Sequence, residues 1–357
     1  MAAALLVAIL VFSLPVRAIS AKSAVLMDCA TGRLLYEKNS DQKSLIASTT
    51  KIMTAILVCE RSNVLDRVRI PKEAVGIEGS SLYLREGEIL TIQELLYGMM
   101  LHSGNDAAVA LAIYCGGTVE GFAQMMNDKA RSIGMTNSHF ENPHGLDAEN
   151  HYSTAYDLAI LSRYAMQNPV FAEIVSTKTV KIGQRQLRNH NKLLWFLDGA
   201  DGIKTGFTKA AGRILVSSAC RDGRRLVAVT ISAPNDWQDH ISLLDNGFQQ
   251  YTQQCIVQKD DVLGYAEIAG GESGKVQLIA NDSLSYPLCM GEEIRIQLPQ
   301  PGFVYAPVSA GQEAGFAQIF LNDSWIGRVE LIYGQTVERD VEQEPGFWQR
   351  LFGGKNT

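Results

Sequence analysis

The chain has 357 residues, of which 46% are hydrophobic and 20% charged, and its formal net charge is −6. This balance is typical of a folded protein and excludes a disordered chain or one with many membrane spans. The acidic excess, with no block of like charges, argues against a nucleic-acid partner, which requires a clustered basic surface. At ~100 to 200 residues per domain, the length predicts two domains.

The N-terminal segment reads as a targeting signal. Residues 2–12 form an unbroken apolar run, followed by Pro15 and by two small-residue sites that end at Ala18 and Ala21. The run is too short to span a bilayer, which needs roughly 20 residues in a helix. We therefore predict a cleaved secretory signal over residues 1–21 and an exported protein. No Lys or Arg precedes the run, and the alternative is a buried N-terminal helix.

A large domain is predicted over residues 22–253. Apolar runs at 23–28 and 33–37 predict a hairpin, Thr91 and Glu94 match a helix capping box, and Asp222-Gly223 is typical of a two-residue hairpin turn. Helical patterns cover residues 48–60, 91–101, 105–115, 122–133, 153–168 and 237–253, and the second pair of strands covers 213–221 and 224–233. We expect Trp195 and Trp237 to pack in the core.

The apolar pattern after residue 257 predicts a small β domain over residues 257–338. Apolar residues alternate there, and Asn322-Asp323 separates two runs that read as paired strands. The tail, residues 339–357, places four apolar residues, Phe347, Trp348, Leu351 and Phe352, within one or two helical turns. It fits an amphipathic contact with a membrane surface, or packing on its own domain.

The chemistry centres on a serine and a lysine. A serine hydroxyl needs a neighbouring base to become a nucleophile. Ser48 and Lys51 lie three residues apart at a predicted helix start, so their side chains share one face. Burial, the helix dipole and a second cation would lower the lysine pKa and make it a base. Ser40 and Lys43 have the same spacing in a polar stretch, which shows that the spacing alone is weak evidence.

Two further motifs follow in the chain. Ser103-Gly104-Asn105 lies between two predicted helices, and Lys204-Thr205-Gly206 begins a strand-like run. The order S-x-x-K, S-x-N, K-T-G is the signature of penicillin-binding proteins and class A β-lactamases.

On these motifs the chain resembles the low-molecular-mass penicillin-binding proteins that are serine-type D-alanyl-D-alanine carboxypeptidases, peptidase family S11. The resemblance runs from Ala24 to about residue 335, through segments 47–54, 103–108, 142–147 and 201–208. It implies an α/β fold in which a β-lactamase/transpeptidase-like domain, an antiparallel sheet flanked by helices, precedes a small all-β C-terminal domain. It also implies removal of the terminal D-alanine from peptidoglycan stem pentapeptides, covalent inhibition by β-lactams, and no cofactor or metal.

The resemblance also implies residue roles. Ser48 would form the acyl-enzyme, Lys51 would be its base and Ser103 would pass a proton to the leaving D-alanine. Asn105 would hold Lys51 and the substrate amide. The backbone N–H groups of Ser48 and Phe207 would form the oxyanion hole. The substrate carboxylate would be bound by three side chains, those of Lys204, Thr205 and Thr208.

Three alternatives are weighed against this interpretation. A class A β-lactamase would need a glutamate for the deacylating water, and Glu141 lacks that class's sequence context. A zinc metallopeptidase would use the cluster His139, His144, Asp147 and His151, although no H-E-x-x-H motif is present. A wall-binding module with a degenerate site is disfavoured by the intact motifs.

Overall fold

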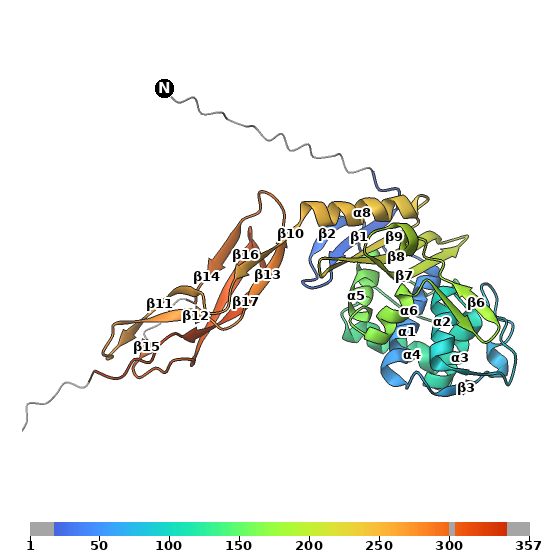
Figure 1. The fold of residues 1–357 in the computed structure, drawn as a ribbon, viewed down its shortest axis with the longest axis horizontal. Helices are drawn as coiled ribbons and strands as arrows, with labels where there is room; N and C mark the ends of the chain where they lie inside the picture. Colours follow the sequence, from blue (N-terminus) through green and yellow to red (C-terminus); the bar gives the residue numbers. More distant parts are fainter. Residues whose placement is uncertain (1–17, 300–303, 341–357) are drawn as a thin grey trace, which may run out of the picture. The chain divides into compact units, whose positions relative to one another are not determined.

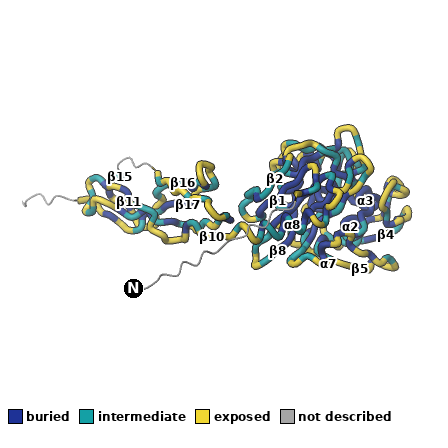
Figure 2. Tube along the Cα trace, turned by 90° about the horizontal axis from the view of Figure 1, so that it is seen from above, coloured by how far each residue is buried: buried dark blue, intermediate teal, exposed yellow. Residues whose placement is uncertain are grey.

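The computed structural model describes residues 18–299 and 304–340. It divides the chain after Gln250 into two compact units (Figure 1). Each unit has its own apolar core, and Figure 2 shows the buried residues gathered inside the larger, N-terminal one. Most of the predicted signal segment and the four aromatic and aliphatic residues of the tail lie outside the described residues.

The first unit is built on one antiparallel sheet with the strand order β2-β1-β9-β8-β7, so β7 is an edge strand. Its strands are β1 (Ser23–Asp28), β2 (Leu34–Lys38), β7 (Ala200–Thr208), β8 (Gly212–Arg221) and β9 (Arg224–Ile231). Asp222 and Gly223, both with positive φ, turn the chain between β8 and β9. The two hairpins expected from the sequence are therefore confirmed.

Helices cover both faces of this sheet. In Figure 1, α8 (Asp236–Gln250) lies over one face and the remaining helices gather beneath the other. Those helices are η1 (Ala47–Thr50), α1 (Lys51–Arg61), η2 (Lys72–Ala74), α2 (Ile92–Leu101), α3 (Asn105–Gly116), α4 (Val119–Ser132), α5 (Ala155–Ala165), α6 (Pro169–Ser176) and α7 (Leu193–Phe196). Two small hairpins accompany them: β3 (Arg67–Arg69) with β4 (Ile89–Thr91), and β5 (Thr179–Ile182) with β6 (Arg185–Arg188).

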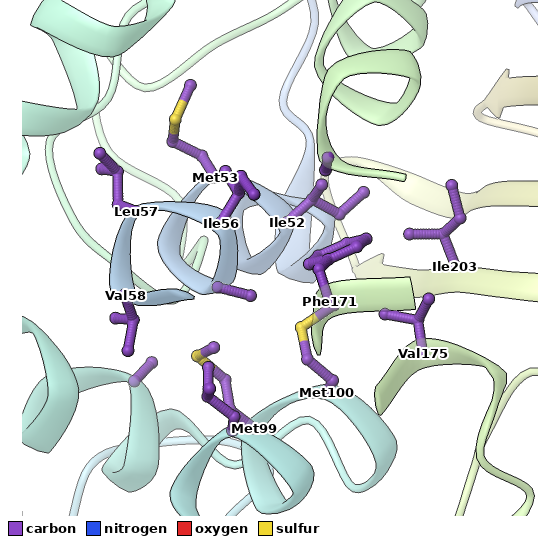
Figure 3. Close-up of a cluster of buried hydrophobic side chains, with 14 of the residues drawn as sticks. Ile52, Met53, Ile56, Leu57, Val58, Met99, Met100, Phe171, Val175 and Ile203 are labelled. Atoms are coloured by element: carbon purple, nitrogen blue, oxygen red, sulfur yellow. The ribbon is translucent and has the colours of Figure 1, made fainter. Parts of the chain in front are cut away.

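Helix α1 runs through the middle of the core. Figure 3 shows its apolar side chains surrounded by residues of α2, α6 and β7. Ile52, Ile56 and Val58 are each no more than 1% exposed. Burying a side chain of this size contributes roughly 1.5 to 3 kcal/mol. The helix that carries Lys51 at its first position is therefore held rigidly from all sides.

Helix ends follow the sequence signals with two differences. The capping box is present, with Glu94 N donating to Thr91 Oγ1 at 3.2 Å and Thr91 N donating to the Glu94 carboxylate at 2.7 Å. The helix predicted to stop at Asn168-Pro169 ends at Ala165, and Asn168-Pro169 instead begins α6, because Asn168 caps it and Pro169 fits the first turn. The helix expected to reach residue 253 ends at Gln250.

The described residues of the second unit form strands and turns. Six strands pair in the order β14-β16-β17-β12-β11-β15, and β10 pairs with β13. They are β10 (Thr252–Val257), β11 (Val262–Ala269), β12 (Lys275–Ala280), β13 (Leu284–Leu288), β14 (Ile294–Gln297), β15 (Val304–Tyr305), β16 (Glu313–Leu321) and β17 (Ser324–Tyr333). The predicted fold class, a helix-flanked antiparallel sheet followed by an all-β domain, is confirmed. Within the described ranges, no helix has the length and apolar character to cross a bilayer.

Candidate active site

Ser48 and Lys51 meet as their spacing predicts. The Lys51 amine is hydrogen-bonded to Ser48 Oγ at 2.9 Å. Ser48 lies in η1, where Ala47 adopts a positive φ of 44° just before it. The serine is partly exposed, whereas Lys51 is fully buried. The pair therefore combines an accessible hydroxyl with an amine that is shielded from water.

Burial and a nearby cation favour the neutral form of Lys51. Its amine donates to Asn105 Oδ1 at 2.7 Å and to the His144 carbonyl at 2.7 Å, and these two bonds use both hydrogens of a neutral amine and leave its lone pair for the Ser48 hydroxyl. Burial, followed by the nearby Lys204 amine, lowers the pKa of Lys51 well below its ordinary value, and Asp106 opposes this shift. A lysine with a lowered pKa can accept a proton near neutral pH. The chemistry required of a general base is thus available at Ser48.

The Ser103 loop is a tight connection between α2 and α3. Ser103 has a φ of 65° and is 5% exposed. Gly104 has no room for a side chain, because a Cβ there would lie 2.9 Å from Asp106 Oδ1. The buried Asp106 carboxylate accepts hydrogen bonds from the backbone of Leu82 and Leu84, which ties this loop to the preceding segment. The loop geometry is therefore built into the packing around it.

Strand β7 packs directly against η1. A Cβ on Gly206 would lie 3.3 Å from both the Ala47 Cβ and the Ser48 backbone nitrogen, so glycine permits this close approach. Lys204, on the same strand, is buried, and its amine donates to the Thr205 carbonyl at 2.8 Å. Burial lowers the pKa of Lys204 to about 7. An edge strand also offers backbone N–H groups that no neighbouring strand uses.

These segments enclose one cleft of about 400 Å³. Ser48, Ser103, Thr205 and Phe207 line it together, although they come from three separate stretches of the chain. Asn105 reaches the same place through its hydrogen bond with Lys51, and the Lys204 amine is near enough to lower the pKa of Lys51. The cleft therefore presents a hydroxyl, a proton acceptor, a second hydroxyl and a cationic strand to a ligand, which is the equipment for acyl transfer.

Comparison with known proteins identifies the family of each of the two units. Residues 11–235 match the family model described as D-alanyl-D-alanine carboxypeptidase, Peptidase S11. The chain belongs to this family. Residues 251–339 match a second model, the C-terminal domain of penicillin-binding protein 5.

Curated relatives and solved structures are similar to this chain over most of its length. The D-alanyl-D-alanine carboxypeptidase DacF of Bacillus subtilis is 33% identical over 83% of this chain and 80% of its own length. DacC of Escherichia coli is 33% identical over 94% of this chain and 87% of its own. Among solved structures, penicillin-binding protein 5 of Haemophilus influenzae superposes with a TM-score of 0.77 at 29% identity, covering 90% of this chain and 98% of that one.

The chain is accordingly a serine-type D-Ala-D-Ala carboxypeptidase, a hydrolase of the penicillin-binding protein class. Penicillin-binding protein D2 of Listeria monocytogenes, solved in its ampicillin-bound form, superposes with a TM-score of 0.60 at 30% identity over 65% of this chain and 99% of that one. The expectation of an enzyme acting on D-Ala-D-Ala peptides is confirmed.

The histidine cluster of the carboxypeptidase supports its loops. His151 bridges Thr50 Oγ1, at 2.8 Å, and the Glu141 backbone nitrogen, at 3.1 Å. His139 Nδ1 lies 2.7 Å from the Asn150 carbonyl, and His144 Nδ1 accepts from Leu146 N at 3.2 Å. In the described ranges, no three His, Cys, Asp or Glu side chains are grouped to hold a metal ion. Each imidazole has a hydrogen-bonding role instead.

The structure gives Thr208 and Trp195 surroundings that the sequence does not indicate. Thr208 Oγ1 donates to Asp147 Oδ1 at 3.1 Å and accepts from Ala211 N at 3.0 Å, and it is not among the residues that line the cleft. Trp195, expected in the core, is 37% exposed, and the Arg188 guanidinium lies 4.8 Å from its ring centre. The prediction for Trp195 was wrong because α7 is a single short turn on the surface of the enzyme.

Motif reasoning missed Arg213. This residue lies opposite Phe207 in the β7–β8 pairing and lines the cleft with Trp237. Its guanidinium donates to both oxygens of Asp236, at 2.8 and 2.9 Å. The sequence could have indicated this position only through the pairing of β7 with β8. Counting residues back from the turn of that hairpin places Arg213 opposite Phe207. The cleft of the carboxypeptidase thus contains the permanently charged guanidinium of Arg213, which belongs to none of the three sequence motifs.

Proposed function

We propose that Ser48 is the nucleophile of this carboxypeptidase and Lys51 its general base. The observation that carries the proposal is the buried Lys51 amine, 2.9 Å from Ser48 Oγ and with its pKa lowered. As Ser48 Oγ bonds to the carbonyl carbon of the penultimate D-alanine, its proton passes to Lys51. Asn105 positions the lysine through the hydrogen bond to its Oδ1 and contacts the substrate amide.

The tetrahedral intermediate is stabilised by backbone N–H groups of Ser48 and Phe207. The close packing of β7 on η1 supports this assignment, because it brings the two segments side by side. Loss of one such donor typically reduces the rate by ~10² to 10³. As the C–N bond breaks, Ser103 delivers a proton to the amine of the leaving D-alanine. Water then hydrolyses the Ser48 ester and returns the serine hydroxyl.

The terminal carboxylate of the substrate is bound by Lys204 and Thr205, with Arg213 as a third partner. Thr205 and Arg213 line the cleft, and Lys204 supplies positive charge from beneath it. Thr208, first expected to bind the carboxylate too, has its hydroxyl engaged by Asp147 and Ala211. Its proposed role is therefore to hold the 142–147 loop against the end of β7.

The substrate proposed is the stem pentapeptide of peptidoglycan, and β-lactams are proposed to acylate the same serine. We also propose that the protein is exported by its N-terminal signal and works outside the cytoplasm in cell-wall synthesis. The predicted tail, residues 339–357, would then contact the membrane surface through its apolar residues. The domain limits 22–253 and 257–338 stay predictions of the sequence.

Labelling with a fluorescent penicillin tests the nucleophile. Ser48→Ala should abolish both labelling and D-alanine release, and mass spectrometry of the wild-type adduct should locate it on the peptide that contains Ser48. Ser40→Ala is the matched control, because Ser40 is followed by a lysine at the same spacing but its hydroxyl donates to Glu37 at 2.9 Å. Retained labelling of folded Ser48→Ala would refute the assignment.

A further inference from the structure

A second cavity adjoins the catalytic cleft. Its volume is about 740 Å³, and it shares His190 and Lys192 with the cleft. Its other lining residues are His102, Gln186, Arg188, Asn189, Trp195 and Phe196. This cavity, here called the side cavity, plays no part in the mechanism described above.

The wall of the side cavity is anchored to the catalytic strand. Asn191 donates to the Gly202 carbonyl of β7 at 2.6 Å, and His190 N donates to the Leu101 carbonyl at the end of α2 at 3.2 Å. Asn189 donates to the carbonyls of Val175 and Thr177 at 3.1 and 3.0 Å. The wall is therefore a preformed surface and not a loose loop.

The position of the side cavity relative to β7 indicates which part of a bound substrate would reach it. In the proposed mechanism the scissile carbonyl lies at Phe207 and the terminal carboxylate at Thr205, so the leaving residue points toward the beginning of β7. Apart from His102, the residues that line the side cavity belong to segment 186–196, shortly before β7, and Asn191 of this segment is hydrogen-bonded to the first half of β7. The side cavity thus lies on the leaving-group side of the cleft.

The chemistry of the side cavity favours an anion. Arg188 and Lys192 line it, and no Asp or Glu is among the described residues that do so. Trp195 and Phe196 are 37% and 56% exposed and add apolar surface beside these cations. The methyl group of a leaving D-alanine is too small to use this surface.

We propose that the side cavity binds the side chain of a larger leaving D-residue and selects an acidic one over a basic one. The inference rests on the proposed roles of Ser48, Thr205 and Phe207, and it extends the activity beyond release of D-alanine. The chemistry is unchanged: the Ser48 ester forms as the amide bond to the leaving residue breaks, that residue departs as an amine with the proton, and water hydrolyses the ester.

Three acylated peptides that end in D-Ala-D-Ala, D-Ala-D-Glu and D-Ala-D-Lys provide the test. With the full chain at low salt we expect kcat/KM for D-Glu to exceed that for D-Lys by about ten-fold, and the ratio to shrink in about 0.5 M salt because exposed charges are screened. Arg188→Glu should invert the ratio while leaving D-Ala release within about two-fold, since a charge at the side cavity is not near the methyl group. Arg131→Glu, an equal charge change on an exposed α4 residue, should leave the ratio unaltered.

The outcomes separate the two proposals. A D-Glu to D-Lys ratio near one, or a ratio that Arg188→Glu does not change while D-Ala release stays intact, overturns the side-cavity proposal alone. Penicillin labelling of folded Ser48→Ala overturns the catalytic assignment on which it rests.

A different observation concerns the start of the mature chain. The buried Asp239 carboxylate accepts hydrogen bonds from Ser20 N at 3.0 Å, Ser20 Oγ at 2.7 Å and Ala21 N at 3.1 Å. Ile19 and Ala21 are 6% and 1% exposed, and the Lys38 amine donates to the Ile19 carbonyl at 2.9 Å. Residues 19–21 are therefore integrated into the catalytic unit.

We infer that the signal is cleaved after Ala18 and not after Ala21, so that the mature enzyme begins at Ile19. Cleavage after Ala21 would remove Ser20 and leave a buried carboxylate without most of its donors, which is costly. Cleavage after the exposed Ala18 keeps every one of these contacts. This inference rests on the proposed export and moves the predicted boundary of the signal by three residues.

Mass spectrometry of the N-terminal peptide of the exported protein tests this inference. We expect Ile19 as the first residue, normal processing in Ala18→Ser and loss of that product in Ala18→Leu, because signal cleavage requires a small residue before the bond. A mature chain that begins at Lys22 would overturn the inference while leaving export intact. A chain that keeps residues 1–18 would overturn the inference together with export.

Discussion

Replacing Lys51 separates the role of a base from that of a structural amine. Lys51→Ala removes the amine, and Lys51→Met removes it while nearly preserving side-chain volume. Because general base catalysis contributes about 10² to 10⁴ in rate, at 1.36 kcal/mol per factor of ten the activation barrier should rise by about 3 to 5 kcal/mol. We expect the upper part of this range, since the fully buried amine leaves little access for water to replace it.

The structure also predicts a separate effect on stability. Without the Lys51 amine, the Asn105 Oδ1 and the His144 carbonyl each lose a donor. A buried acceptor without a partner costs about 1 to 3 kcal/mol in the free energy of unfolding. A drop in activity is therefore informative only when the folded fraction is known for the same sample.

The assay is the second-order rate constant for acylation by a fluorescent penicillin, with thermal unfolding measured in parallel. Lys43→Ala is the control: Lys43 has the same spacing from Ser40, but its amine is exposed and lies 4.6 Å from the centre of the Tyr152 ring. It should acylate at the wild-type rate. If folded Lys51→Met acylates within about ten-fold of wild type, below the range for a general base, Lys51 is not the base.

Three further predictions follow from the geometry. The Lys204 amine lowers the pKa of Lys51, so Lys204→Ala should raise that pKa and move the increase of acylation rate to higher pH; an unchanged pH profile would contradict this coupling. Gly145→Ala should lower the free energy of unfolding by at least about 2 kcal/mol and reduce penicillin labelling, because its Cβ would lie 1.8 Å from the Ala47 carbonyl oxygen beside Ser48. Gly134→Ala, with a similar positive φ but open space around it, should cost only about 1 kcal/mol in the same denaturation experiment. Treatment with a chelator should leave D-alanine release unchanged; a loss restored by zinc would revive the metallopeptidase alternative.

Local features of this enzyme could be derived from the sequence because their causes are local. The contact between Ser48 and Lys51 follows from one turn of helix, the start of α2 from the capping box at Thr91, and the β8–β9 hairpin from Asp222-Gly223. The order of the three motifs, together with the resemblance it carries, predicted the family and the activity.

Where the sequence failed, the placement of a residue in the folded structure was the cause. Trp195 looks like a core residue by composition, but it lies on the surface beside Arg188. Arg213 belongs to no motif and enters the cleft only because β8 pairs with β7. The contacts of Asp239 with Ser20, 219 residues away, could not be read from the pattern of either segment.

The sequence by itself therefore determined which groups this carboxypeptidase brings to its reaction, since residue type and short spacing specify a hydroxyl, an amine and the turn that joins them. Only the tertiary structure decided the state of those groups. The amine of Lys51 favours its neutral form because folding buries it away from water and places the Lys204 amine nearby, while Asn105 and the His144 carbonyl hold it in position. A pKa depends on dielectric surroundings and on charges in space, and folding alone brings these together.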